Sequence, residues 1–318
     1  MKLEKKNADD NPEEELYGIQ KERNIRQVQF GLGKKFLTWY GSNVYFNKST
    51  RLLGYINMPK SPGKKGKIQS PVGQYWLDTL YICEYCFKYT DQLKELESHI
   101  SHCLYAKKAP GRIMYKSPDI TIRRVKGWKH ELYCQCLCLF TKLFLDNKSM
   151  YFKLPHYEFY IIYKTGSTKP MGYFSKDILS YARYNLACIL TFPPYQRQHV
   201  GTYLMEFSYK LSKLEGIASG PETPLSPFGL ISYINYWSRI IAMELLEGEL
   251  MGYNYVTLEM ISKVTGFRIS DIITTFKQLD CLDENDNILL NKLKMWAKGK
   301  SKHLKGYYLD NEYFLADA

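Results

Sequence analysis

The spacing of four potential metal ligands in residues 83–103 restricts how this part of the chain can fold. Cys83 and Cys86 are separated by two residues, so a tight turn can direct both sulfurs to one point. His99 and Cys103 are four positions apart on a predicted helix and therefore share one helix face. Four such ligands leave no open position for water, which is typical of structural zinc. We predict zinc bound by these four residues; incidental spacing is the alternative.

A finger of this kind either stabilises a fold or reads DNA. Its helix, DQLKELESH, carries more acidic than basic residues, whereas phosphate contacts need lysine and arginine. We therefore favour a structural role for the metal. His102 is adjacent to Cys103 and points elsewhere, so we do not expect it to be a ligand.

Composition indicates a globular protein that is large enough for one big domain or several modules. The 318 residues are 45% hydrophobic and carry a formal net charge of +12, which suits nucleic acid or a phosphorylated ligand; a solvated basic surface is the alternative. The eight cysteines match intracellular thiols and one metal site better than a disulfide framework. We expect no signal peptide and no membrane span, because the first 16 residues are mostly polar and long apolar runs are lacking.

Strand and helix patterns alternate along the chain. Residues 1–16 predict a disordered tail, and residues 57–73, rich in Pro, Gly and Lys, predict a mobile basic loop. VQFGLGKKFLTWYGSNVYF predicts two strands around a turn. Several β-prone runs between residues 112 and 190 flank the helical segment CQCLCLFTKLFLD. The C-terminal part predicts two helices, TLEMISKVTG and RISDIITTFKQL, and then a short strand, NILL.

Residues 187–216 predict a strand, a compact turn and a helix. The strand LACILTF ends at Pro193, and the helix is expected to end at Gly216 with a buried stripe of Leu204, Phe207, Leu211 and Leu214. A helix N-terminus after such a turn directs several free N–H groups to one spot, which suits a diphosphate. Arg197 adds positive charge. An ordinary strand–helix connection that binds nothing is the alternative.

These stretches resemble the MYST-type histone acetyltransferases. The family pattern is an ACILT strand, then Pro-Pro-Tyr-Gln-Arg, a glycine-containing loop and a helix reading EFSYxLS; this chain has ACILTFPPYQR and EFSYKLSKLEG. The resemblance continues through GPETPLSPFGLISYINYW, the finger, CLCLFTKLFLDNKSMYF and VQFGLGKKFLTWY, and it is greatest for the fungal silencing members. It covers roughly residues 17–290.

The resemblance implies an α+β fold with a GNAT-like acetyl-CoA-binding core, an N-terminal C2HC zinc finger module and a C-terminal helix-turn-helix (winged-helix-like) segment. We therefore expect four parts along the chain. They are a disordered tail at 1–16, strands and finger at 17–110, the catalytic core at 111–236 and a helix-turn-helix-like region at 237–318.

The activity that the resemblance implies is transfer of acetyl from acetyl-CoA, the cosubstrate, to a lysine amine of a histone tail, with lysine 16 of histone H4 as the target. The implied role is chromatin silencing or regulation in the nucleus. The implied partners are the H4 tail in nucleosomes, companion subunits of a SAS-like complex and non-specific DNA, with no membrane. A non-catalytic or weakly active chromatin adaptor with a degraded cofactor loop is the alternative.

Three residues take implied roles in the reaction. Glu222, in GPETPLS, matches the family's general base, which takes the proton of the lysine ammonium; an ordinary loop glutamate is the alternative. Cys188 matches the active-site cysteine and either accepts the acetyl group or lines the pocket; a small buried thiol is the alternative. Lys142 matches the lysine that the family acetylates on itself, or it closes an amphipathic helix.

The implied cofactor contacts follow the strand, the turn and two later positions. The residues are Ile189, Leu190, Thr191, Gln196, Arg197, Gln198, His199, Val200, Gly201, Thr202, Ser226 and Asn235. Asn235 stands where family members often carry serine. His199 replaces a glycine of the usual Gln-Arg-x-Gly-x-Gly loop, which is harmless at negative φ and costly where a close approach to phosphate needs glycine. A histidine could instead donate a hydrogen bond to phosphate.

Overall fold

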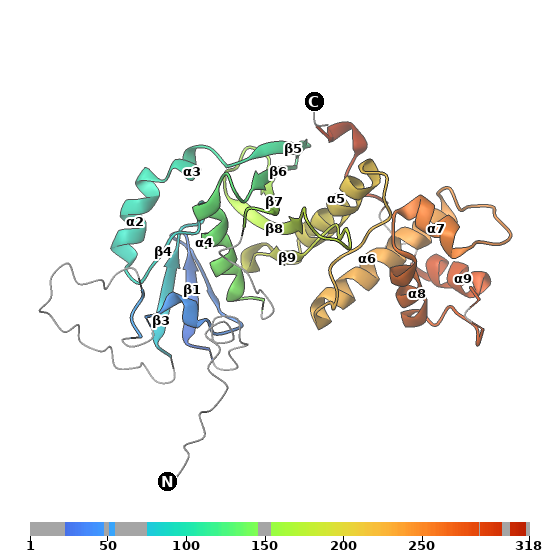
Figure 1. The fold of residues 1–318 in the computed structure, drawn as a ribbon, viewed down its shortest axis with the longest axis horizontal. Coiled ribbons are helices and arrows are strands. Elements are labelled where there is room, and N and C mark those ends of the chain that lie inside the picture. The colour runs from blue at the N-terminus through green and yellow to red at the C-terminus, as the bar shows by residue number, and fades with distance from the viewer. Residues whose placement is uncertain are drawn as a thin grey trace, which may run out of the picture. The chain divides into compact units, whose positions relative to one another are not determined.

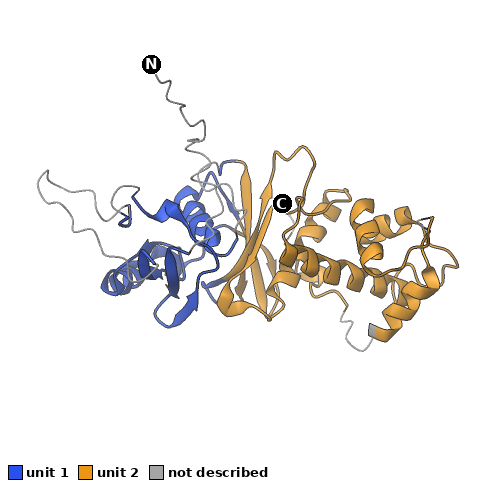
Figure 2. Cartoon of the chain, turned by 90° about the horizontal axis from the view of Figure 1, so that it is seen from below, with its two compact units in different colours: residues 1–111, 125–155, 166–170 blue, residues 112–124, 156–165, 171–318 orange. Residues whose placement is uncertain are grey.

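The computed structural model describes residues 23–47, 51–54, 75–145, 154–285, 287–300 and 306–315. The tail expected at 1–16 and the basic loop expected at 57–73 lie outside these residues. The chain divides into two units, coloured in Figure 2. Unit 1 comprises residues 1–111, 125–155 and 166–170, and unit 2 comprises residues 112–124, 156–165 and 171–318.

Unit 1 contains a four-stranded sheet in the order β2–β1–β3–β4; Figure 1 labels β1, β3 and β4. β1 (Ile25–Phe30) and β2 (Lys34–Leu37) pair antiparallel, which confirms the predicted pair of strands around a turn. β1 runs parallel to β3 (Leu77–Ile82), and β3 pairs antiparallel with β4 (Tyr89–Thr90).

Aromatic side chains hold the predicted helix α4 (Glu131–Lys142) against this sheet. Phe30 of β1 stacks on Phe140 of α4 with ring centroids 5.2 Å apart, and Phe87 lies 5.6 Å from Phe140. All three rings are fully buried, and each contributes about 1.5–3 kcal/mol of hydrophobic stabilisation. The other helices of unit 1 are α2 (Leu93–His102) and α3 (Leu104–Lys107).

Unit 2 contains a five-stranded sheet whose strands are neighbours in chain order. The strands are β5 (Arg112–Lys116), β6 (Ile120–Lys126), β7 (Tyr157–Lys164), β8 (Pro170–Asp177) and β9 (Cys188–Thr191). Strands β6 to β9 occupy the predicted β-prone runs, whereas β5 lies outside them, and the predicted mixture of strands and helices is confirmed.

Helix α5 (Val200–Leu214) follows β9 and packs on the sheet. Leu204 and Phe207 are fully buried, and Leu211 packs against the same core, as predicted. The prediction for Leu214 is wrong, because this side chain is 74% exposed. Leu214 is the last residue of α5, so its side chain lies at the end of the helix, beyond the buried stripe.

The C-terminal helices share a second core. They are α6 (Pro227–Leu246), α7 (Leu258–Thr265), α8 (Ile269–Gln278) and α9 (Leu290–Lys300). α7 ends at the left-handed Gly266, and α8 begins three residues later, as the two-helix pattern predicts. The predicted strand NILL is wrong: Ile288 forms a single bridge with Leu282 and Leu290 begins α9, because a four-residue apolar run does not distinguish a strand from a helix.

None of the helices within the described ranges combines the length and apolarity that crossing a bilayer requires.

A buried carboxylate attaches the C-terminal segment to α5. Glu206 is 0% exposed and accepts hydrogen bonds from the backbone N–H groups of Tyr308 (3.0 Å) and Leu309 (2.8 Å). Leu309 is buried in the core under α5, and Phe314 stacks on Phe207 with ring centroids 5.2 Å apart. We call residues 306–315 the C-terminal strap.

Replacing Glu206 with alanine tests this attachment. Glu206→Ala should lower the free energy of unfolding by about 2–4 kcal/mol, because it removes the acceptor of two backbone N–H groups. Urea unfolding followed by circular dichroism measures the change. The matched control, Glu284→Ala, removes an exposed carboxylate and should change stability by less than about 0.5 kcal/mol. Equal stability of the two variants would contradict the role of Glu206.

Candidate functional site

The four predicted zinc ligands converge in unit 1. Their sulfur and nitrogen atoms all lie within 4.8 Å of one another. Cys83 and Cys86 belong to the turn between β3 and β4, which a hydrogen bond from the Phe87 N–H to the Cys83 carbonyl closes at 3.0 Å. His99 lies on α2 and Cys103 directly follows its last residue. Three thiols and one imidazole around one point fit a tetrahedral structural zinc site.

Hydrogen bonding already favours a thiolate in this cluster. The contact with Cys86 lowers the pKa of Cys83 to about 5. The same interaction raises the pKa of Cys86, whose sulfur lies 3.1 Å from Nε2 of His99. Zinc would hold all three sulfurs as thiolates, because metal binding releases their protons.

In unit 2 a short backbone pairing holds Glu222 beside the beginning of β9. Leu186 and Pro221 form a parallel bridge. The Asn185 N–H donates to the Gly220 carbonyl at 3.0 Å, and the Glu222 N–H donates to the Leu186 carbonyl at 2.8 Å. Cys188, half-buried at the start of β9, lies two residues beyond Leu186. The two residues matched to the reaction therefore belong to neighbouring strand-like segments, and Glu222 is exposed.

The N-terminal end of helix α8 (Ile269–Gln278) also supports the segment that carries Glu222. The guanidinium of Arg268 donates to the Pro221 carbonyl at 2.8 Å and pairs with Asp271 at 2.9 Å. A Cβ at Gly220 would lie 2.2 Å from Asp271 Oδ2, so only glycine permits this close approach. Sequence reasoning missed Arg268 and Asp271, since an Arg and an Asp three residues apart on a helix are usually a surface pair.

The turn between β9 and α5 has the predicted form. A single 3-10 turn, Pro193–Tyr195, follows the strand, and residues 196–199 are exposed. The first intrahelical hydrogen bond runs from the Tyr203 N–H to the His199 carbonyl at 3.0 Å, so the amides of residues 200–202 point out of the helix end. This end attracts anions. A Cβ at Gly201 would lie 3.4 Å from Thr191 Oγ1, an ordinary van der Waals distance, so the first turn of α5 lies close to the end of β9.

A glycine on β8 lets β9 and α5 approach each other. Gly172 of β8 is the partner of Thr191 in the sheet. A Cβ there would lie 2.7 Å from the Leu190 carbonyl and 3.1 Å from the side chain of Val200. Gly172 was not predicted from the sequence, because a single glycine in a β-prone run carries no specific signal.

His199 adopts the left-handed conformation, with φ 60° and ψ 9°. A side chain at position 199 would be harmless at negative φ, but φ is positive here. In a residue with a Cβ this left-handed conformation costs roughly 1–2 kcal/mol. The imidazole packs against the C-terminal strap: its ring centroid lies 5.1 Å from that of Tyr308, and Nδ1 lies 3.3 Å from the Tyr308 hydroxyl.

The remaining expected contact residues occupy separate positions. Ser226 is the N-cap of α6, and its hydroxyl accepts a hydrogen bond from the Gly229 N–H at 3.1 Å; its hydrogen can still be donated. Asn235 is exposed on α6. Lys142, the last residue of α4 in unit 1, is only 8% exposed.

Replacing single ligands tests the zinc site. His99→Ala should lose the metal and destabilise unit 1, because three ligands hold zinc less well than four. Metal analysis of the purified chain should give about one zinc ion per wild-type molecule and almost none in the variant.

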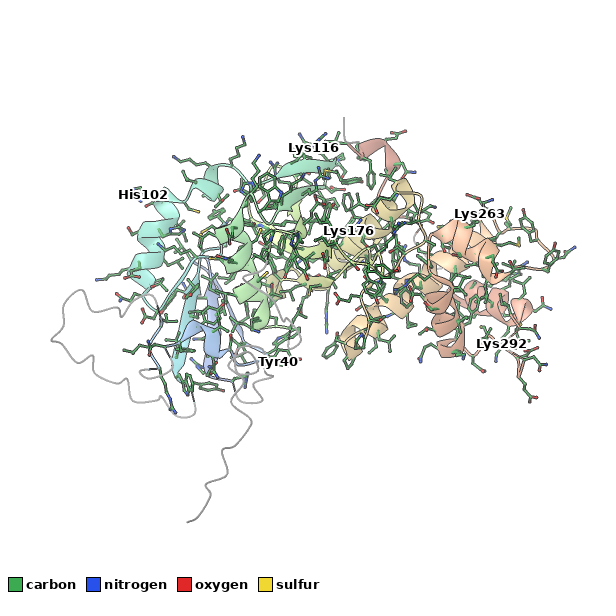
Figure 3. The ribbon with its side chains drawn as sticks, viewed as in Figure 1. Tyr40, His102, Lys116, Lys176, Lys263 and Lys292 are labelled. Carbon is green, nitrogen blue, oxygen red and sulfur yellow. The ribbon has the colours of Figure 1, made fainter. Side chains whose placement is uncertain are left out.

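The matched control is His102→Ala. His102, labelled on α2 in Figure 3, is exposed and its Nδ1 lies 3.0 Å from the Ser98 carbonyl. This variant should keep its zinc. Loss of zinc from both variants would show that general damage to the helix, and not ligation, is being measured.

Comparison with known protein families gives matches for the zinc finger and for the rest of the chain that follows it. The MOZ/SAS family model matches residues 108–314, and the MYST family zinc finger domain model matches residues 71–103. The chain is 59% identical over 305 residues to the histone acetyltransferase SAS2 of Saccharomyces cerevisiae, which covers 96% of this chain and 88% of that protein.

Two relatives are more distant. The histone acetyltransferase MOF of Drosophila melanogaster is 36% identical over 269 residues, 84% of this chain and 29% of that protein. The histone acetyltransferase KAT6B of Mus musculus is 35% identical over 240 residues, 74% of this chain and 13% of that protein. The chain therefore belongs to the MOZ/SAS family and is an acetyltransferase of the MYST histone acetyltransferase type, with the zinc finger of that family.

Proposed function

We propose that this enzyme transfers the acetyl group of acetyl-CoA to lysine 16 of histone H4, with Glu222 as the general base and Cys188 in an assisting role. The observation that carries the proposal is the backbone pairing that keeps Glu222 next to the segment leading into Cys188. This pairing supports the proposal, because it puts the backbone of residue 222 beside the segment that enters β9, and β9 leads to the anion-attracting end of α5.

Glu222 has the task of removing a proton. A lysine ammonium has a pKa near 10.4, so forming the free amine at neutral pH costs roughly 4–5 kcal/mol. A positioned carboxylate accepts this proton as the amine attacks. Acetyl-CoA supplies the thioester, whose carbon–sulfur bond breaks as the new amide bond forms. Glu222 is exposed in the free chain, so an arriving histone tail would exclude water from it and carry the lysine to it.

Cys188 has two compatible roles. Its sulfur is half-buried at the start of β9, where it either lines the thioester site or accepts the acetyl group before the lysine does. In both roles it acts beside Glu222, and we assign the essential proton transfer to the glutamate.

The cofactor contacts are proposed along the strand–turn–helix unit. The backbone of Ile189–Thr191 would follow the pantetheine arm, and residues 196–202 would surround the diphosphate with backbone amides and the Arg197 cation. Support comes from the outward-pointing amides of the first turn of α5. Ser226 and Asn235 would add contacts from α6.

Further proposals concern partners and location. The net charge of +12 would meet the phosphates of CoA and of nucleosomal DNA, whereas carboxylates such as Glu222 would meet the cationic H4 tail. SAS2-like function further suggests companion subunits of a SAS-like complex, a nuclear, chromatin-bound location and a role in silencing.

At the level of the fold, we propose that the five-stranded sheet with α5 is a GNAT-like core and that α7 and α8 form a winged-helix-like segment. The four-part division at residues 16, 110 and 236 stays a prediction, and α6 crosses the last of these limits. Lys142 is the proposed site of self-acetylation. Acetylation would remove a charge from this buried amine, which reduces the cost of its burial.

Replacing the proposed base separates chemistry from cofactor binding. Glu222→Gln should lower the turnover of an H4 tail peptide by about 10²–10⁴-fold, while calorimetry detects unchanged acetyl-CoA binding. The matched control, Glu215→Gln, changes an exposed glutamate at the end of α5 and should keep wild-type turnover. Wild-type turnover by Glu222→Gln would exclude the glutamate as the base.

Peptide variants test the lysine specificity. An H4 peptide with arginine at position 16 should lose most acetylation, because arginine keeps the charge and lacks the nucleophilic amine. A peptide with arginine at position 12 is the control and should be acetylated like the unchanged peptide. Mass spectrometry identifies the modified position, and equal acetylation of both variants would contradict the assignment to lysine 16.

A further inference from the structure

We propose that Tyr308 of the C-terminal strap is a positioning residue for the cofactor loop, because it holds His199 in the left-handed conformation from which α5 begins. This inference rests on the proposed binding of acetyl-CoA at the α5 N-terminus. The inference is based on the contact between the His199 and Tyr308 rings, which come from segments far apart in the sequence.

The loop before α5 contains unusual backbone conformations. Arg197 and His199 both have φ near 60°, and neither is glycine. Residues with a Cβ persist in this region only where their surroundings hold them there. The described contacts of the His199 side chain are with Tyr308: the rings are 5.1 Å apart and tilted by 34°, and the hydroxyl lies 3.3 Å from Nδ1.

Contacts besides the one with His199 hold Tyr308 in place. The backbone N–H of Tyr308 donates to the buried carboxylate of Glu206 at 3.0 Å, and the next residue, Leu309, is buried in the core. The guanidinium of Arg239 donates to the Gly306 carbonyl at 2.6 Å and lies over the Tyr308 ring at 4.9 Å from its centroid. Tyr203 of the first turn of α5 contacts the same ring edge-on at 5.4 Å.

This arrangement has a direct consequence for the amides that follow His199. If the imidazole is released, the backbone of residue 199 can leave the left-handed region, and the amides of residues 200–202 lose their common direction. With glycine at position 199 the left-handed conformation carries no such cost. Tyr308 should therefore matter only while residue 199 has a side chain.

The experiment is a double-mutant cycle on the affinity for acetyl-CoA, measured by calorimetry on the full chain. Tyr308→Ala should raise the dissociation constant of acetyl-CoA by about 5- to 10-fold. In the His199→Gly background the same change should alter the affinity by less than about twofold. A coupling of this size between the two positions supports the inference.

Tyr307→Ala is the matched control. Tyr307 precedes Tyr308 on the strap, and its hydroxyl donates to Glu244 at 2.9 Å. This variant should bind acetyl-CoA like the wild type, whereas a loss equal to that of Tyr308→Ala would show that loosening of the strap is sufficient and would overturn the inference.

Two further outcomes are distinguishable. An equal loss of affinity from Tyr308→Ala in both backgrounds would overturn the positioning role and leave the proposed function intact. Absence of acetyl-CoA binding by the wild-type chain would instead remove the proposed function on which the inference rests.

Tyr308→Phe keeps the ring and removes the hydroxyl, so it should retain at least half of the wild-type affinity if ring packing holds His199. A tenfold loss from Tyr308→Phe would contradict ring packing as the cause.

Discussion

Two backbone hydrogen bonds between residues 185–186 and 220–222 join the two segments that carry the proposed catalytic residues. They join the segment that enters β9 to the segment that carries Glu222, and they do so through main-chain atoms. Arg268 and Asp271 hold the second segment from α8, so the position of a proposed catalytic group depends on a helix of the C-terminal core. Gly220 permits this packing because any Cβ would collide with Asp271.

The opposite end of β9 depends on a different set of contacts. Gly172 lets the strand and the first residue of α5 approach each other. His199 occupies a conformation that favours glycine, and the strap supplies the surroundings that compensate for its Cβ. The buried Glu206 is central to that support, since its carboxylate accepts two backbone hydrogen bonds from the strap. Burial raises the pKa of Glu206, and the donated N–H groups oppose that effect by stabilising the charged form.

The zinc finger is a separate stabilising element within unit 1. Its ligands come from the β3–β4 turn and from α2, and they join a two-residue strand to a helix with an acidic first turn. Such short elements bury little apolar surface by themselves, so a metal contributes folding free energy that the local sequence cannot supply. The acidic character of α2 agrees with this structural role, because phosphate contacts would require cations on its exposed face.

Much of the fold and of the candidate site could be predicted from local sequence patterns. The zinc ligands, the two-strand hairpin, helix α4, the strand–turn–helix unit and the helices α7 and α8 all follow from spacing and periodicity, because each depends on a pattern within one continuous stretch of the chain. The misassignments, Leu214 and the strand NILL, occur where a pattern ends. Pairing between distant segments was not predictable: neither the bridge from Leu186 to Pro221 nor the contact between Tyr308 and His199 has a signature in the separate stretches. The residues alone thus specify which chemical groups the chain carries and which elements they belong to, whereas the left-handed backbone at residue 199 and the placement of Glu222 beside β9 arise only when segments far apart along the chain pack together and share hydrogen bonds.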